Sequence, residues 1–283
     1  MKRKTTYRKT ISRKPVRSTF SKILRFACLS IFALGFIVLL YHYRTGLAYY
    51  LGFKSNKISE KEAEDKRLSD VRNFQVLAKH EGKSIGLDVS EYQGEISWSY
   101  VDTLEQKYPL DFVFIRATIG KDRKDYQFKR NWVGAKKNKM IRGAYHYYRP
   151  NENSIEQADL FIKTVKLEKG DLPPVLDIER LPKNQSLDSL KKGLKRWLNK
   201  VEAHYQVRPI IYTGERYYSD FLKEEFSEYL FWIANYNFYR EKIEDDWLFW
   251  QFTEKATVPG IKNRVDVNIY NGDLEQLQFI TVE

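Results

Sequence analysis

Two carboxylic acids stand two residues apart at the end of an apolar run, in the segment PPVLDIER at residues 173–180. Such a run is typical of a buried strand, and side chains at positions i and i+2 of a strand share one face of the sheet. Asp177 and Glu179 should therefore point the same way as Val175. Burying two carboxylates is unfavourable unless they have partners or a function. Two interpretations follow: a catalytic acid/base couple, or strand-end acids that pair with Arg180 or cap the next helix.

The residue types that support most other enzyme chemistry are scarce. Cys28 is the only cysteine, and the four histidines show no HxxxH or HExxH spacing. This argues against disulfides, cysteine-based zinc sites and the common metalloprotease motifs. The sequence also lacks GxSxG, Walker and GxGxxG motifs. We therefore expect no metal and no cofactor.

From residue 83 onward, short apolar runs alternate with amphipathic stretches. The candidate strands are residues 84–89, 112–118, 141–148, 174–179, 209–213, 230–234, 248–252 and 264–268. Five helical patterns lie between the first six strands, at residues 98–107, 126–139, 154–167, 187–205 and 215–229. This alternation predicts an α/β fold with a parallel sheet and right-handed crossovers. Eight strands suggest closure into a TIM-like β/α barrel that lacks its final helices.

Acids recur at the ends of these strands. Asp88 ends the first strand, Asp177 and Glu179 end the fourth, and Asp266 lies within the eighth. Catalytic residues of β/α barrels sit at the C-terminal ends of the strands, so the four carboxyl groups should converge on one mouth. Such a mouth suits glycoside hydrolysis, in which one carboxyl donates a proton and another stabilises an oxocarbenium-like centre. Like charges held close raise one of the pKa values, which supplies the acid.

Aromatic side chains gather at the same strand ends, where stacking on sugar faces is one interpretation and core packing is the other. For Trp98, Trp132 and Trp197 we prefer core packing. The candidates for sugar stacking are Tyr92, Tyr147, Tyr148, Tyr212, Trp232, Tyr236 and Trp250.

The positive charge of the chain is concentrated at its N-terminal end. Of the 49 Lys and Arg residues, 13 fall within residues 1–58, where no acid occurs. The remainder is nearly neutral, so we expect no nucleic-acid partner. Residues 26–43 carry no charge and predict a transmembrane signal anchor, with the basic tail 1–25 in the cytoplasm. A cleaved signal peptide is the alternative, disfavoured by the long basic region and the lack of a small-residue cleavage site.

The remaining chain would then lie outside the cytoplasm, on the periplasmic or cell-wall side of the cytoplasmic membrane. Residues 44–82 are rich in charge and predict a partly helical spacer; a first helix packed on the domain is the alternative. Residues 83–283 are expected to form a monomeric globular domain. Without disulfides, its stability must come from its core.

Short motifs follow one another along residues 84–280. They are GLDVS (86–90), QG (93–94), FIRAT (114–118), GAYHY (143–147), DIE (177–179), IYT (211–213), WIA (232–234), WQF (250–252) and VDVN (265–268). Each motif alone is weak, but in this order the set resembles the glycoside hydrolase family 25 muramidases, also called Chalaropsis-type lysozymes. The chain departs from the family pattern at Arg116, Ile119 and the pair Tyr147–Tyr148, which affects the substrate rim and no catalytic carboxylate.

The resemblance implies an irregular β/α barrel that cleaves the β-1,4 bond between N-acetylmuramic acid and N-acetylglucosamine in peptidoglycan. It implies Glu179 as the general acid and Asp177 as the partner of the substrate 2-acetamido group, in a substrate-assisted retaining route. An inverting or covalent route stays open. Asp88 and Asp266 would hold the geometry of the site. The implied substrate-binding residues are Tyr147, Tyr212, Trp232, Tyr236 and Gln251.

Two other functions are compatible with the same barrel. One is a non-catalytic glycan-binding module, which the presence of all four acids argues against. The other is a barrel hydrolase that acts on chitin-like polymers. The expected partners are therefore peptidoglycan glycan strands, together with the cytoplasmic membrane through residues 26–43.

Overall fold

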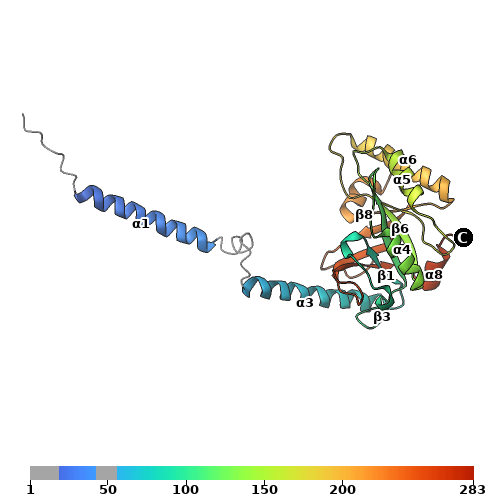
Figure 1. Ribbon diagram of the computed structural model, residues 1–283, viewed down its shortest axis with the longest axis horizontal. Coiled ribbons are helices and arrows are strands. Elements are labelled where there is room, and N and C mark those ends of the chain that lie inside the picture. Colours follow the sequence, from blue (N-terminus) through green and yellow to red (C-terminus); the bar gives the residue numbers. More distant parts are fainter. Residues whose placement is uncertain (1–18, 43–55) are drawn as a thin grey trace, which may run out of the picture. The chain divides into compact units, whose positions relative to one another are not determined.

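The computed structural model describes residues 19–42 and 56–283 (Figure 1). The chain divides into two compact units, residues 1–65 and 66–283. Helix α1 (Thr19–His42) belongs to the first unit. Within the described residues, no helix combines the length and apolarity that a membrane crossing requires. The predicted anchor at 26–43 is therefore not shown; its last residue, and most of the predicted basic tail, lie outside the described residues.

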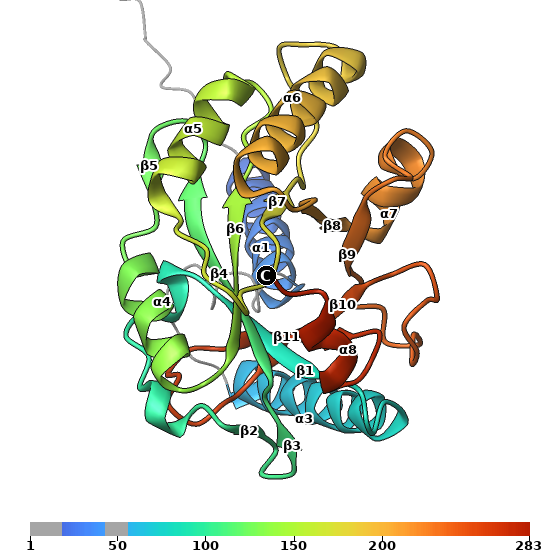
Figure 2. The ribbon, with the colours of Figure 1, turned by 90° about the vertical axis from the view of Figure 1, so that its right-hand side faces the viewer.

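The second unit is built around a closed barrel of eight strands (Figure 2). The sheet order is β1-β11-β10-β9-β8-β7-β6-β4, and β1 also pairs with β4, which closes the ring. The short strand β5 (Arg123–Lys124) extends the rim beyond β4. The barrel strands are β1 (Ile85–Val89), β4 (Phe112–Ile119), β6 (Ile141–Tyr147), β7 (Val175–Asp177), β8 (Ile210–Gly214), β9 (Leu230–Ala234), β10 (Phe249–Ala256) and β11 (Val265–Tyr270).

The direction of β11 is the main irregularity of the barrel. All other neighbouring pairs in the ring are parallel, whereas β11 runs antiparallel to both β10 and β1. The antiparallel return from β10 to β11 needs no crossover helix. The predicted barrel of eight strands is confirmed, and its one reversed strand explains why no helix lies between β10 and β11; the parallel strands β9 and β10 are joined by the loop 235–248, which also contains no helix.

Helices α4 (Phe128–Lys137), α5 (Ser154–Thr164) and α6 (Leu187–Tyr205) lie outside the strands (Figure 2). The bounds of α6 are those predicted from its apolar spacing. The helix predicted at 98–107 is wrong, because this stretch forms a 3-10 turn, η2 (Trp98–Tyr100), and a hairpin of β2 (Thr103–Leu104) and β3 (Tyr108–Pro109). The helix predicted at 215–229 is shorter, consisting of α7 (Glu215–Tyr217) and a π-helical turn, η3 (Tyr218–Leu222).

Aromatic rings fill the lower part of the barrel interior. Phe114 stacks on Trp232 with ring centroids 4.5 Å apart, and Phe112 and Phe249 pack edge-on beside them. Gly143 on β6 leaves room for this packing, since a Cβ there would lie 2.5 Å from the Phe114 ring. Helix α8 (Leu274–Phe279) adds Leu277 to the same cluster. These packed side chains form a floor across the barrel interior. Space for a ligand therefore remains only between this floor and the C-terminal ends of the parallel strands.

The last turns of helix α3 (Asn56–Lys79) pack on the barrel unit. Val76 and Leu77 are buried in the main core cluster. The guanidinium of Arg72 donates to the carbonyl oxygens of Phe252 at 2.6 Å and Asn237 at 2.9 Å. The charged segment 44–82 had two interpretations, a spacer and a helix packed on the domain. Its residues 72–77 follow the second.

Candidate active site

A cavity of about 650 Å³ opens at the end of the barrel above the aromatic floor. The four candidate acids and the five residues implied to bind substrate all line it, and they lie on or just after strands spread around the ring. They are Asp88, Tyr147, Asp177, Glu179, Tyr212, Trp232, Tyr236, Gln251 and Asp266. The structure therefore brings the four predicted carboxyl groups to one opening.

Asp88 and Asp266 face each other across the antiparallel pair of β1 and β11. Because β11 is reversed, its N-terminal end reaches the edge where the parallel strands have their C-terminal ends, so Asp266 lies at the mouth. Burial raises the pKa of Asp88 to about 6, although hydrogen bonds from Asn268 and Gln251 oppose the rise. Burial, and then the charge of Asp88, raises the pKa of Asp266 to about 9. The pair therefore holds a proton on Asp266 near neutral pH.

Asp177 and Glu179 form the second carboxyl pair. Burial raises the pKa of Asp177 well above its usual range, and the nearby Glu179 raises it further. Glu179 is exposed to the solvent of the cavity; partial burial raises its pKa, while a hydrogen bond with Asp177 and the charge of Arg180 lower it. Of the two carboxyl groups, Asp177 therefore holds a proton more firmly than Glu179. Within the described residues, Oδ1 of Asp177 is buried without a hydrogen-bond partner.

Side-chain amides fix the position of Asp88. Gln251 Nε2 donates to Asp88 Oδ2 at 2.7 Å, and Asn268 Nδ2 donates to the same oxygen at 2.8 Å. Gln251 Oε1 in turn accepts from the hydroxyl of Tyr212 at 2.7 Å and from that of Tyr236. Charge-assisted hydrogen bonds of this kind hold a carboxylate in one orientation. Gln251 thus links Asp88 to the phenols of the opposite wall.

Trp232 contributes to the floor of the site. Its ring is buried, and its indole N–H donates to Asn268 Oδ1 at 2.8 Å. This bond leaves the Asn268 amide oriented towards Asp88. Trp232 also lines the cavity, so it supports the site through its bond to Asn268.

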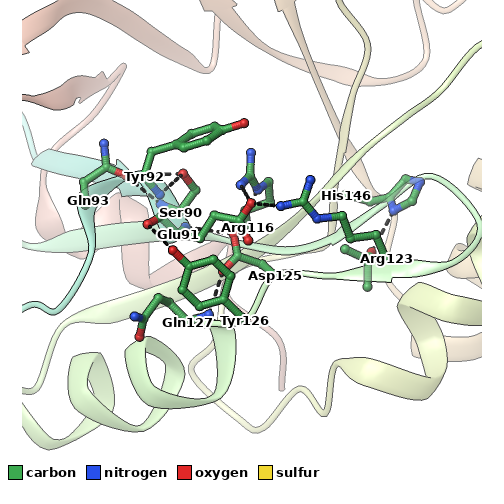
Figure 3. Close-up of polar contacts among 11 residues, drawn as sticks. Ser90, Glu91, Tyr92, Gln93, Arg116, Arg123, Asp125, Tyr126, Gln127 and His146 are labelled. Carbon is green, nitrogen blue, oxygen red and sulfur yellow. Dashed lines mark hydrogen bonds and ion pairs between the residues drawn. The ribbon is translucent and has the colours of Figure 1, made fainter.

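A salt-bridge cluster stands beside the cavity (Figure 3). Arg116 lies between Glu91, at 3.1 Å from its Nη2, and Asp125, at 2.9 Å from its Nε. Arg123 reaches the same Glu91 carboxylate from the rim. The exposed ring of Tyr92 covers the Arg116 guanidinium at 4.7 Å. The buried charges of this wall are therefore paired, and Arg116 lines the cavity in a fixed position.

Two of the aromatic candidates do not reach this cavity. Trp250 is buried on the outer face of β10, where its indole N–H donates to the Asn235 carbonyl at 2.9 Å. Tyr148 is buried and lines a smaller separate pocket. Both side chains therefore belong to the core. Their neighbours Gln251 and Tyr147 line the cavity, and successive residues of a strand point to opposite faces.

The comparisons with known proteins agree with this architecture. The sequence profile of Glycosyl hydrolases family 25 matches residues 87–261. This chain belongs to glycosyl hydrolases family 25. As a family 25 member it is a glycoside hydrolase, which confirms the predicted enzyme class. The family resemblance noted in the sequence is confirmed as well.

Among its family 25 relatives, the chain is 40% identical over 197 residues to the uncharacterized protein YegX of Escherichia coli K12, covering 68% of this chain and 71% of that protein. It is 32% identical over 207 residues to Lysozyme M1 of Streptomyces globisporus, covering 68% and 69%. A family 25 glycosyl hydrolase from Bacillus anthracis superimposes with a TM-score of 0.63 at 29% identity, covering 70% of this chain and 94% of that one. A lysozyme from Streptomyces coelicolor gives 0.63 at 28%, covering 71% and 98%.

The sequence did not single out every residue that supports or surrounds this site. Asn268 does not line the cavity but donates to Asp88; it lies two residues after Asp266, so the same i, i+2 rule that paired Asp177 with Glu179 would have found it. The rim residues come from the short strand β5, the irregular end of β10 and the turns after β6 and β7, for which the sequence gives no such signal. They are Arg123, Arg149, Arg180 and Glu254. In the described part of the chain, no group of three or more His, Cys, Asp or Glu residues is arranged to hold a metal ion.

Proposed function

We propose that this family 25 hydrolase is an N-acetylmuramidase that cleaves the β-1,4 bond between N-acetylmuramic acid and N-acetylglucosamine in peptidoglycan. The observation that carries the proposal is the convergence of two carboxyl pairs, each with raised pKa values, on one cavity. Glycoside hydrolysis needs a carboxyl group that stays protonated near neutral pH and a second one that stabilises positive charge. The relatives named as lysozymes support the choice of substrate.

Glu179 acts as the general acid and Asp177 as the partner of the 2-acetamido group. In the free protein Asp177 holds a proton more firmly than Glu179, and its Oδ1 has no hydrogen-bond partner among the described residues. An acetamido N–H donated to this oxygen favours the carboxylate form of Asp177. The proton then moves to Glu179, which transfers it to the glycosidic oxygen as the bond breaks. Substrate binding thus produces the protonated form of Glu179 that the reaction requires.

Asp88 and Asp266 hold the other side of the site. The Asp88 carboxylate is fixed by two amide donors, and protonated Asp266 donates to it. This arrangement adds one negative charge to the cavity instead of two. A single fixed charge stabilises an oxocarbenium-like centre without preventing the protonation of Glu179.

The decisive experiment replaces Glu179 by Gln, which keeps the shape and removes the proton. We expect kcat on purified peptidoglycan to fall at least 10²-fold, on the scale of general acid catalysis, with unchanged unfolding. The exposed Glu275→Gln variant serves as the matched control. Mass spectrometry of the reducing ends identifies the cleaved bond, and proton NMR of fresh products distinguishes retention from inversion. Full activity of Glu179→Gln would contradict the role of the acid.

Two alternatives are separated by the same assays. A glycan-binding module would bind glycan strands and release no reducing ends. A hydrolase of chitin-like polymers would digest N-acetylglucosamine oligomers in preference to peptidoglycan. The four acids speak against the first, and the lysozyme relatives against the second.

We also propose that the enzyme works outside the cytoplasm, held at the cytoplasmic membrane by residues 26–43. The support is sequence-based: this stretch carries no charge and follows a 25-residue tail that contains ten Lys and Arg residues, as expected of a cytoplasmic flank. Fractionation of cells that produce the full chain tests the proposal. Recovery of the enzyme in the soluble cytoplasmic fraction would refute it.

A further inference from the structure

The rim of the cavity is divided by charge. Four arginines line the side formed by β4, β5 and the turns after β6 and β7: Arg116, Arg123, Arg149 and Arg180. The side formed by β10, β11 and β1 carries acids and no arginine: Glu254, Asp266 and Asp88. Asp177 and Glu179, at the end of β7, are the acids on the arginine side. A ligand with a negative substituent therefore has one favourable orientation in the cavity.

These arginines differ in whether they already form salt bridges with carboxylates of the protein. Arg116 and Arg123 share Glu91, and Arg116 also pairs with Asp125. Arg149 pairs with Glu152, 3.1 Å from its Nη1.

Arg180 is the exception among them. It is exposed, and within residues 56–283 no carboxylate lies within 4.0 Å of its guanidinium nitrogens. Its guanidinium lies 5.9 Å from the centroid of the Tyr147 ring. Its donors are thus available to a ligand in the cavity.

Arg149 and Arg180 act on the same part of the wall. Burial raises the pKa of Tyr147, while the charges of both arginines lower it, so both lie close enough to influence one phenol. Arg180 also follows Glu179 directly in the chain. A group bound by Arg180 would therefore belong to the sugar residue at the cleavage point or to a substituent on it.

We propose that Arg180, assisted by Arg149, binds a carboxylate on the peptide substituent of the glycan and makes the enzyme selective for strands whose stems carry free carboxylates. The inference rests on the proposed function. Peptidoglycan stems carry several carboxylates close to the glycan, and the planar fork of arginine binds a carboxylate through two parallel hydrogen bonds. Asp88 and Glu254 of the opposite rim would repel the same group, which adds to the selectivity.

A second role of Arg180 has to be separated from this one. Its charge lowers the pKa of Glu179, so its removal affects the chemical step on every substrate. Recognition of a carboxylate instead affects only substrates that carry one. The difference between two substrates, and not the activity on one, tests the inference.

The experiment uses soluble peptidoglycan fragments in two forms: native, with free stem carboxylates, and the same fragments amidated with carbodiimide and ammonia. We expect the wild type to show a KM about three- to tenfold lower for the native form, the range of an exposed to partly buried ion pair. Arg180→Ala should lose this preference, and Arg180→Lys should keep part of it. Arg216→Ala, 95% exposed and outside the cavity, is the matched control.

Loss of the preference in Arg180→Ala, through KM and with the control unchanged, supports the inference. An equal KM of the wild type for both forms overturns it. So does an Arg180→Ala variant that keeps the KM preference, whatever happens to its kcat, because Arg180 would then act through Glu179 alone. If the wild type cleaves neither form, the proposed function itself is refuted.

Discussion

Replacement of Asp266 by Asn should stabilise the protein, and more so as the pH rises. Asp266 faces Asp88 across β1 and β11, and burial raises its pKa to about 9. An unfolded aspartate has a pKa of about 4. The folded chain therefore binds a proton that the unfolded chain has released above pH 4. Asparagine keeps a hydrogen-bond donor for Asp88 and needs no proton.

The size of the effect follows from the linkage between proton binding and folding. Because the native state binds more protons, the contribution of Asp266 to stability falls as the pH rises from about 4 to about 9, by at most about 1.4 kcal/mol per pH unit. Between pH 5 and pH 8 the wild type should lose up to about 4 kcal/mol relative to Asp266→Asn. Solvent access at the cavity mouth reduces this figure.

Urea unfolding of both proteins at pH 5, 6, 7 and 8 measures the difference. The exposed Asp220→Asn variant, which removes a surface carboxylate paired with Arg216, controls for the loss of one negative charge. A difference between Asp266→Asn and wild type that is the same at all four pH values would show that Asp266 takes up no proton on folding. The assignment of the proton to Asp266 would then be wrong.

Three further changes test the site and its support. Gln251→Leu removes a donor to the Asp88 carboxylate, so the pKa of Asp88 should rise above about 6 and the acid limb of kcat/KM should move up by about one pH unit; an unmoved limb would contradict this. Gly143→Ala places a Cβ 2.5 Å from the Phe114 ring and should cost about 1–3 kcal/mol in urea unfolding. Arg72→Ala leaves two carbonyl oxygens without their donor and should lower the unfolding free energy by about 2–3 kcal/mol, measured in the same way.

The barrel could be predicted because its strands and long helices have strong local patterns. Helix α6 was found to the residue, since Leu190, Leu194 and Trp197 repeat at helical spacing and are all buried. The segment 98–107 has apolar residues at similar spacing but turns back, with Glu105 and Gln106 at positive φ. The secondary structure of such short segments is determined by tertiary contacts and not by their sequence alone.

The candidate site was predictable wherever it lies on strands. The expected alternation pointed Asp177 and Glu179 to one side; β7 ends at Asp177, yet both side chains line the cavity. Closure of the barrel brought Asp88 next to the strand of Asp266. The reversal of β11 could not be inferred from the residues, although the placement of Asp266 depends on it. Arg149 and Arg180 lie in turns after strands, whose conformations are set by the packed barrel and not by a periodic pattern.

The region that matches the family and the region that folds as one compact unit start at different residues of this chain. The family match starts at residue 87, yet the compact unit starts at residue 66. The intervening turns of α3 insert Val76 and Leu77 into the core and place Arg72 on a β10 carbonyl. A recombinant fragment trimmed to the homologous region would lose these contacts and present bare apolar surface. Expression of the barrel unit by itself therefore requires a start upstream of the family match, at or before residue 66.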